Sequence, residues 1–406
     1  MLVKFKSTLS EQKREAIFAA YQTKKLKRIP GLDIYKLQIP EGTSVEEMLY
    51  LFNQNPDMEY ASPNYYRYHT ITPNDTLFNE QYALYNSGQV VGPPGSPQGK
   101  NRADIKATAG WEETKGEKTV IIAVIDTGID LEHPDLINKI SPNGWDFVDG
   151  DSVPEYIYWW GTHVAGIAGA ETNNGEGIAG VAWNCKIMPL KVFWIDPVDG
   201  QPTTDDSLII EAIKYAADNG ADVINMSFGD SADNPALEAA LKYAYERDVV
   251  CVAAAGNDGE AVLFPAAYDD YCLAVAATDN NDERVTFLNS SDDPLGPWES
   301  NFGPEVDVAA PGLYIWSCDL VSEDPDFPYR LASGTSMAAP HVAGLAALIK
   351  SIKPHLTAAE IMSVIRYSAD DINSSRYPGK DDYVGYGRLN MEKALAPIML
   401  SSSKKQ

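Results

Sequence analysis

Three polar residues of this 406-residue chain follow an apolar run or open a helical pattern, where a side chain can do chemistry. Asp126 ends the run VIIAVID, Asn257 follows VVCVAAAG, and Ser336 opens the helical pattern of SGTSMAAPHVAGLAALI. A carboxylate can orient a base, an amide can donate to a developing oxyanion, and a hydroxyl at a helix N-terminus can be a nucleophile. Taken singly, each also fits a local structural role, as a turn aspartate, a turn asparagine or an N-cap serine.

Apolar runs that predict strands alternate with helical patterns from about Thr70 onward. The strand runs are VIIAVID, KIMPLKVF, DVINMSF, VVCVAAAG and YCLAVAATD, and helices are expected over GTHVAGIAG and over residues 207–218 and 235–247. Continuous apolar strands separated by helices are typical of an α/β fold with a mainly parallel central sheet flanked by helices. Because sites in such sheets form at the carboxyl ends of strands, we expect Asp126 and Ser336 at the same end.

The first 68 residues predict a separate small α/β domain. Strands are expected over residues 2–5, 32–37 and 58–61 and helices over 11–24 and 45–53, a βαβ-type alternation that gives a sheet backed by two helices. This segment carries a formal charge of +2, which leaves −28 for the remainder of the chain. The two parts are therefore complementary in charge.

Composition sets the outer limits on function. A hydrophobic content of 44% supports a large core, and a net charge of −26 argues against nucleic acid or an anionic membrane as partner. No apolar run reaches the ~18 residues of a membrane span, and the start lacks the apolar core of a signal peptide, so we expect an extracellular protein with a trimmed signal or one that stays in the cytoplasm. We expect a monomer. Reduced, buried thiols are expected at Cys185, Cys251, Cys272 and Cys318.

The motifs DTGID, GTHVAG, NMSFG, AAAGND and SGTSMAAPHVAG, in this order, resemble those of the subtilisin-like serine peptidases. TPNDTLF and WDFVDGDSVPE make the sequence most similar to the thermitase-like branch. The resemblance implies a subtilisin-like peptidase domain over residues 70–397 and an unstructured tail over 398–406. It also implies that residues 1–68 form a propeptide, a folding assistant and inhibitor whose tail lies in the cleft until it is cut.

The resemblance assigns roles residue by residue. Asp126 matches the aspartate that orients the base, Ser336 matches the nucleophile and Asn257 matches the oxyanion donor. The segment that pairs with an extended peptide substrate as an added strand matches Ser227, Phe228 and Gly229. The implied activity is endopeptidase hydrolysis of broad specificity.

The sequence departs from this family at the general base. The family's catalytic histidine opens the pattern H-G-T-H, and here Trp160 opens it, after four further bulky residues at 156–159. Indole is a donor only and cannot take a proton from serine. His163 is three residues further along the same helix, and neither it nor His341, His133 or His69 is expected to act as the base.

Two classes of function follow from this departure. The chain is either a serine endopeptidase precursor whose hydrolysis is strongly impaired, or a catalytically dead relative that serves as a peptide-binding or regulatory module. A deliberately inactivated proform is a third possibility.

Calcium is the cofactor that the resemblance implies, at two places rich in oxygen ligands. The first set combines Asp75, Asp135 and the side chain of Asn174 with the carbonyl groups of Glu171, Glu176 and Ile178. The second set lies in DFVDGDSVPE and comprises Asp146, Asp149, Asp151, Val153 and Glu155. Solvated acidic loops without a metal ion are the alternative for both.

Overall fold

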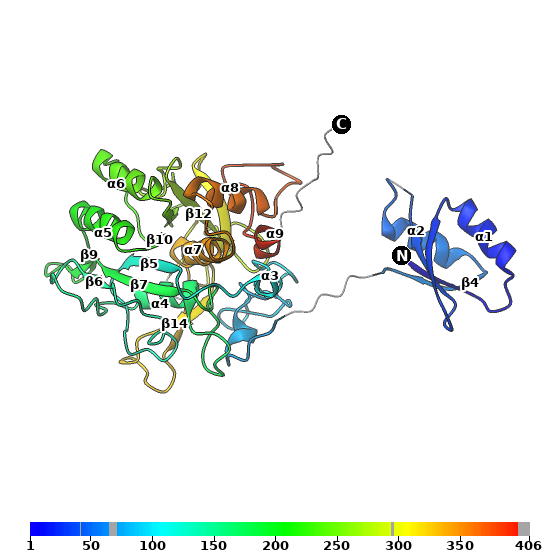
Figure 1. Ribbon diagram of the computed structural model, residues 1–406, viewed down its shortest axis with the longest axis horizontal. Coiled ribbons are helices and arrows are strands. Elements are labelled where there is room, and N and C mark those ends of the chain that lie inside the picture. The colour runs from blue at the N-terminus through cyan, green and yellow to red at the C-terminus, as the bar shows by residue number, and fades with distance from the viewer. Residues whose placement is uncertain (41, 65–70, 294–295, 397–406) are drawn as a thin grey trace. The chain divides into compact units, whose positions relative to one another are not determined.

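The structure is a computed structural model that describes residues 1–406 except 41, 65–70, 294–295 and 397–406 (Figure 1). The chain divides into two compact units, residues 1–69 and 70–406, which are described separately. The predicted tail at 398–406 lies outside the described residues, as does His69.

The N-terminal unit is a four-stranded antiparallel sheet with two helices. Its strands lie in the order β2-β3-β1-β4, and its core contains Val3, Phe5, Phe18, Tyr35 and Phe52. The elements are β1 (Leu2–Phe5), α1 (Glu11–Ala20), β2 (Lys24–Ile29), β3 (Ile34–Gln38), α2 (Val45–Gln54) and β4 (Met58–Ser62). The sheet and both helices agree with the sequence prediction, but the βαβ-type description was wrong because every pairing is antiparallel and β2 was not predicted.

The C-terminal unit has a seven-stranded sheet in which every pairing is parallel, in the order β13-β12-β11-β10-β5-β7-β6. The strands are β5 (Ile121–Asp126), β6 (Trp145–Asp146), β7 (Lys186–Lys191), β10 (Val223–Met226), β11 (Val250–Ala254), β12 (Cys272–Thr278) and β13 (Val306–Pro311). Two antiparallel pairs lie outside this sheet, β8 (Trp194–Ile195) with β9 (Pro202–Thr203) and β14 (Ile315–Cys318) with β15 (Tyr329–Ala332). The predicted parallel sheet flanked by helices is confirmed.

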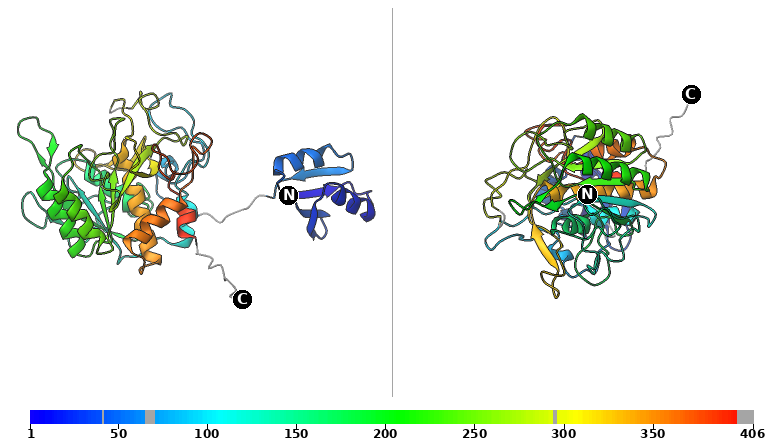
Figure 2. Two further views of the ribbon diagram at one scale, coloured as in Figure 1. Left: turned by 90° about the horizontal axis from the view of Figure 1, so that it is seen from above. Right: turned by 90° about the vertical axis from the view of Figure 1, so that its left-hand side faces the viewer.

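Helices cover both faces of this sheet (Figures 1 and 2). Along β5, Ile122 and Val124 face a core shared with α4 and α7, while Ala123 and Ile125 face a core shared with α5 and α6. Because both faces of the strand are buried, its sequence is apolar throughout instead of alternating. The helices are α3 (Ala107–Glu113), α4 (Trp160–Gly169), α5 (Asp206–Asp218), α6 (Pro235–Tyr245), α7 (Thr335–Ile352), α8 (Ala358–Ser368) and α9 (Met391–Leu395), with a short 3-10 helix at Phe78–Glu80.

The parallel arrangement places the carboxyl ends of β5, β10 and β11 side by side at one edge. The buried helix α7 has its N-terminus at this edge, because its first residue, Thr335, donates a hydrogen bond to Asn257 in the segment after β11. As predicted, all four cysteines are buried and free of disulfides. Among the described residues, no helix is long and apolar enough to cross a membrane.

Candidate active site

The N-terminus of α7 brings Ser336 to two neighbouring strand ends. Its Oγ donates a hydrogen bond to the main-chain oxygen of Ser227, 2.9 Å away, directly beyond β10. Asn257, beyond β11, accepts through Oδ1 from the main-chain N–H and the hydroxyl of Thr335, at 2.9 and 3.0 Å. Because a main-chain N–H can only donate, Oδ1 must face Thr335, and the Nδ2 donor faces away from it.

Asp126 is the last residue of β5 and is buried at the same edge. Burial raises the pKa of this carboxyl to about 7, although hydrogen bonds from Thr127, one of them from its main-chain N–H at 2.7 Å, oppose the shift. The carboxyl forms no ion pair within the described part of the chain. Burial without a cationic partner favours the neutral form.

Trp160 is the first residue of α4, and Thr127 fixes the chain on both sides of it. The hydroxyl of Thr127 donates to the main-chain oxygen of Tyr158 and accepts from the N–H of Gly161, both at 3.1 Å. Tyr158 packs edge-on against the Trp160 ring, with centroids 4.8 Å apart, and Trp159 does so at 5.8 Å. The 156–160 segment is therefore an ordered aromatic cluster at the end of β5.

A pocket of about 220 Å³ joins these parts. Its lining includes Trp160, Asn257 and Ser336, together with Ser333, Met337 and the 296–298 segment. Trp160 keeps 38% of its surface exposed there. The structure thus brings Ser336, Asn257 and Trp160 together in one pocket, and places Asp126 behind Gly161, where an added Cβ would lie 3.2 Å from the Cβ of Asp126.

None of the four histidines that the structure describes lines this pocket. His163 is fully buried with Nε2 3.3 Å from the main-chain oxygen of Arg330, and burial lowers its pKa to about 3. His133 contacts the main-chain oxygen of Pro328 at 2.9 Å, and His355 is exposed after α7.

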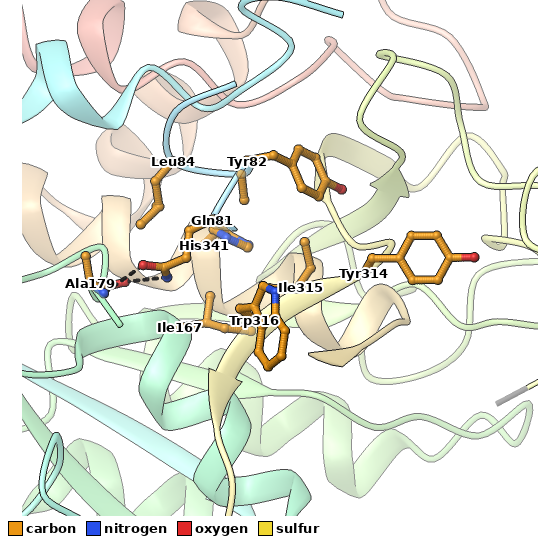
Figure 3. Close-up of a pocket in the computed structure, with 10 residues that line it drawn as sticks. Gln81, Tyr82, Leu84, Ile167, Ala179, Tyr314, Ile315, Trp316 and His341 are labelled. Carbon is orange, nitrogen blue, oxygen red and sulfur yellow. Dashed lines mark hydrogen bonds between the residues drawn. The ribbon is translucent and has the colours of Figure 1, made fainter. Parts of the chain in front are cut away.

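His341 belongs to the core of the domain. Its Nδ1 lies 2.9 Å from the main-chain oxygen of Met337, and burial lowers its pKa to about 4. Figure 3 shows it among the residues that line a small pocket, where Gln81 makes two hydrogen bonds to the main chain of Ala179. This pocket has a volume of about 10 Å³. The space suffices for roughly one water molecule and for no substrate.

A larger groove lies beside the segment that follows β10. Phe228 and Gly229 line a pocket of about 410 Å³ whose floor is apolar and whose rim carries carboxylates. The apolar lining includes Phe193, Ile209, Leu237 and Phe264, and the acidic rim comprises Asp205, Asp206 and Asp230. Ser227, Phe228 and Gly229 therefore run from the Ser336 hydroxyl to this groove.

The first predicted calcium set is partly assembled as an acidic centre. Asp135 accepts hydrogen bonds from Asn174 Nδ2 at 2.8 Å and from the N–H of Ile178 at 3.0 Å, and Asp75 accepts from the N–H of Asn173. Burial raises the pKa of Asp135 to about 6 and raises that of Asp75. Neither carboxyl has an ion-pair partner among the described residues, so both are available to a cation. Glu171 and Glu176 lie on the same loop, residues 171–178.

Two carboxylates of the second predicted set pair with a lysine that the sequence analysis did not single out. Lys191 Nζ lies 2.7 Å from Asp146 Oδ2 and 3.2 Å from Asp149 Oδ2. Burial alone would lower the pKa of Lys191, but the hydrogen bonds to these carboxylates raise it. Since this ammonium already pairs with Asp146 and Asp149, these two carboxylates are less available to a metal ion than those of the first set. No group of three or more His, Cys, Asp or Glu in the described ranges is arranged to hold one.

A parallel sheet that brings a serine at a helix N-terminus, an amide and a buried aspartate to one edge defines an α/β serine hydrolase. The chain belongs to the subtilase family, whose sequence model matches residues 117–387, and the model of the fervidolysin N-terminal prodomain matches residues 1–64. These matches confirm the resemblance and the N-terminal propeptide.

Curated relatives cover most of the chain. The thermophilic serine proteinase of Bacillus sp. (strain AK1) is 39% identical over 95% of this chain and 86% of its own length. Thermitase of Thermoactinomyces vulgaris is 38% identical over 80% of this chain and 99% of its own length. The halolysin-like extracellular serine protease Nep of Natrialba magadii is 37% identical over 84% of this chain and 56% of its own length.

Among solved structures, a protease from Pseudoalteromonas arctica superposes with a TM-score of 0.63 at 30% identity, over 80% of this chain and 99% of that one. A lanthipeptide protease superposes with a TM-score of 0.57 at 28% identity, over 70% of this chain and 89% of that one. Both likenesses support the subtilisin-like fold.

Proposed function

We propose that this subtilase is a serine endopeptidase precursor whose hydrolysis is strongly impaired because no base activates Ser336. One observation carries the proposal: the pocket that contains Ser336 and Asn257 contains the indole of Trp160 and no histidine among its described lining. The Ser336 hydroxyl donates to a main-chain carbonyl, which cannot remove its proton.

The other groups keep the roles that the family implies. Asn257 Nδ2 and the N-terminus of α7 stabilise an oxyanion, and Ser227, Phe228 and Gly229 pair with an extended peptide of broad sequence. Asp126 has no imidazole to orient and stays a buried carboxyl near Gly161. Removal of the base from such a triad lowers turnover on the order of 10⁶-fold, which corresponds to about 8 kcal/mol of transition-state stabilisation.

A second candidate function is peptide binding without turnover, as a regulatory module. The observation that favours it is the groove of about 410 Å³ beside Phe228 and Gly229, which is open although the base is missing. Apolar pockets beside a main-chain pairing segment select peptides by their side chains.

An assay of peptide hydrolysis beside Ser336→Ala tests the proposal. We expect the two proteins to differ by a small residual rate at most, because oxyanion stabilisation and binding alone retain ~10³–10⁴-fold acceleration over water. Turnover at ordinary protease rates that disappears in Ser336→Ala would refute the impairment and the binding-module alternative together.

We further propose calcium at the first set, with Asp75, Asp135 and Asn174 as side-chain ligands. Two buried carboxylates without a cationic partner support this assignment, because uncompensated burial of charge is unfavourable. The bound ion would stabilise the loop at 171–178 and would take no part in peptide hydrolysis.

The natural partners are then a peptide substrate and the chain's own propeptide. We propose an extracellular location, which the similarity to the extracellular protease Nep of Natrialba magadii supports. Recovery of the protein from the medium of its source cells, without its presence in the cell lysate, is the test.

A further inference from the structure

Two tryptophans from distant parts of the sequence line the Ser336 pocket. Trp160 opens α4, and Trp298 lies after the turn at residues 287–292. Trp160 packs on Tyr158 and Trp159, and among the described residues it makes no ring contact with Trp298, so the two indoles line the pocket without stacking on each other. Pro297 and Met337 complete the apolar lining. No role in peptide hydrolysis explains why this pocket is aromatic.

Both indoles are held in place by contacts with neighbouring side chains. Trp298 is only 9% exposed. Its main-chain N–H donates a hydrogen bond to Ser290 Oγ at 2.9 Å, and its indole Nε1 donates one to Asp293 Oδ2 at 3.3 Å. Trp160 is fixed edge-on by the rings of Tyr158 and Trp159. A binding surface whose aromatic walls are already ordered loses little conformational entropy when a ligand enters.

The polar atoms of the pocket select the chemistry of the ligand. Asn257 uses Oδ1 to accept from Thr335, so Nδ2 remains as a donor, and the N-terminus of α7 favours a partial negative charge. No Asp or Glu is among the described lining residues, so nothing there would balance a cation. The pocket suits a group with an acceptor oxygen beside a flat apolar ring.

Its size agrees with a phenyl ring. The pocket has about 220 Å³, and an enclosed apolar cavity of about 150 Å³ is known to hold benzene. Aromatic rings gain from edge-to-face and offset contacts with indole, and the thioether of Met337 adds a sulfur–aromatic contact.

We infer that this pocket binds an aromatic side chain of a peptide, whose neighbouring carbonyl oxygen accepts a hydrogen bond from Asn257 Nδ2. The inference rests on the proposed function, because it takes the site to bind peptides, and it adds the class of residue that the peptide must carry. Trp160 and Trp298 are the residues that determine this selectivity, and Trp160 thereby serves binding at the position where a base is missing.

The test is ¹⁹F NMR on the full chain labelled with 5-fluorotryptophan, titrated with N-acetyl-phenylalaninamide and with N-acetyl-alaninamide. The resonances of Trp160 and Trp298 are assigned from Trp160→Phe and Trp298→Phe. We expect both to shift saturably with the phenyl compound, which binds about tenfold more tightly than the alanine compound. Trp145, which stacks on Tyr215 and does not line the pocket, provides the internal control and should not shift.

Variants separate the two parts of the site. Trp160→Ala should remove the tenfold preference and leave the alanine compound unchanged, Asn257→Ala should weaken both compounds equally, and Trp145→Ala should change neither. Equal affinity for the two compounds, or no saturable shift of Trp160 or Trp298, overturns the inference. If Trp298→Ala lowers the melting temperature, Trp160→Ala decides alone, since its side chain is 38% exposed. Hydrolysis at ordinary protease rates would refute the proposed function separately, whatever the NMR titration gives.

Discussion

Ser336 and Ser227, 109 residues apart in the sequence, exchange two hydrogen bonds. Ser336 Oγ donates to the main-chain oxygen of Ser227 at 2.9 Å, and Ser227 Oγ donates to the main-chain oxygen of Ser336 at 2.8 Å. The pair locks the start of α7 to the end of β10. It also holds the hydroxyl proton of Ser336 against an atom that cannot remove it, which is the resting state of an unactivated nucleophile.

Trp160→His should restore hydrolysis only in part. An imidazole at the start of α4 would supply a base near Asp126, but Tyr158 and Trp159 would still pack around the side chain at position 160. A misplacement of about 1 Å can cost on the order of 100-fold in rate. We therefore expect a gain of several orders of magnitude in kcat that remains below the ~10⁶-fold value of an intact triad. The measurement is peptide turnover, with Trp160→His/Ser336→Ala as the control, and a full gain from the single change would contradict the role given to the aromatic segment.

Asp126→Asn should stabilise the protein at high pH and not at low pH. Burial raises the pKa of Asp126 from 3.8 to about 7. The stability that the protonated carboxyl contributes to the folded state is therefore fully present below pH 4 and is lost as the pH rises through 7. The loss is at most about 4 kcal/mol, and asparagine avoids it because it does not ionise. Urea unfolding of both proteins at pH 4 and pH 8 measures the difference. A variant that is destabilised more at pH 8 than at pH 4 would show that the ionised carboxyl has a stabilising partner and would contradict this prediction.

Removal of calcium should lower the melting temperature through the first set alone. Saturation at 100 times the Kd contributes about 2.7 kcal/mol of stability, so a chelator should lower the melting temperature by several degrees. Asp135→Asn should abolish this calcium-dependent shift, while Asp149→Asn, beside Lys191, should preserve it. A chelator without effect on the unchanged protein would count against calcium at both sets.

The purified chain should remain a single covalent species. The propeptide junction that the resemblance implies, near residues 68–72, lies largely outside the described residues, and its cleavage requires an activated Ser336. Because no base is in place, the intact mass should not change during prolonged incubation with calcium. Loss of about 68 residues that Ser336→Ala prevents would show that another group takes the proton and would revive the enzyme interpretation.

The sequence predicted the elements whose burial pattern is strong. β5 was visible because both of its faces are buried, and α7 because Ser336 begins an almost wholly apolar segment. By contrast, β2 was missed because its sequence KKLKRI is exposed at nearly every position and forms a sheet edge, so no apolar periodicity marks it. The helix α1 ends four residues before the end of the predicted helix.

The site residues that belong to sequence motifs were predictable, and those that reach the site through long-range packing were not. Ser336, Asn257 and Trp160, which the motifs single out, line one pocket. Trp298 reaches that pocket from a turn-rich segment whose sequence gives no periodic signal, and Lys191 neutralises Asp146 across two neighbouring strands. Such contacts depend on which segments the fold brings together, and no local pattern encodes them.

Gly161 fixes the position of residue 160 independently of its side chain. A Cβ at Gly161 would come within 2.1 Å of the main-chain oxygen of Gly128, so only glycine lets α4 begin this close to the turn after β5. The preceding position is therefore presented to the Ser336 pocket by the backbone, whatever side chain it carries. Substitutions at 160 can change the chemistry of the pocket without changing the fold, which makes this chain a ready scaffold for a series of single variants that differ only in the group facing the serine.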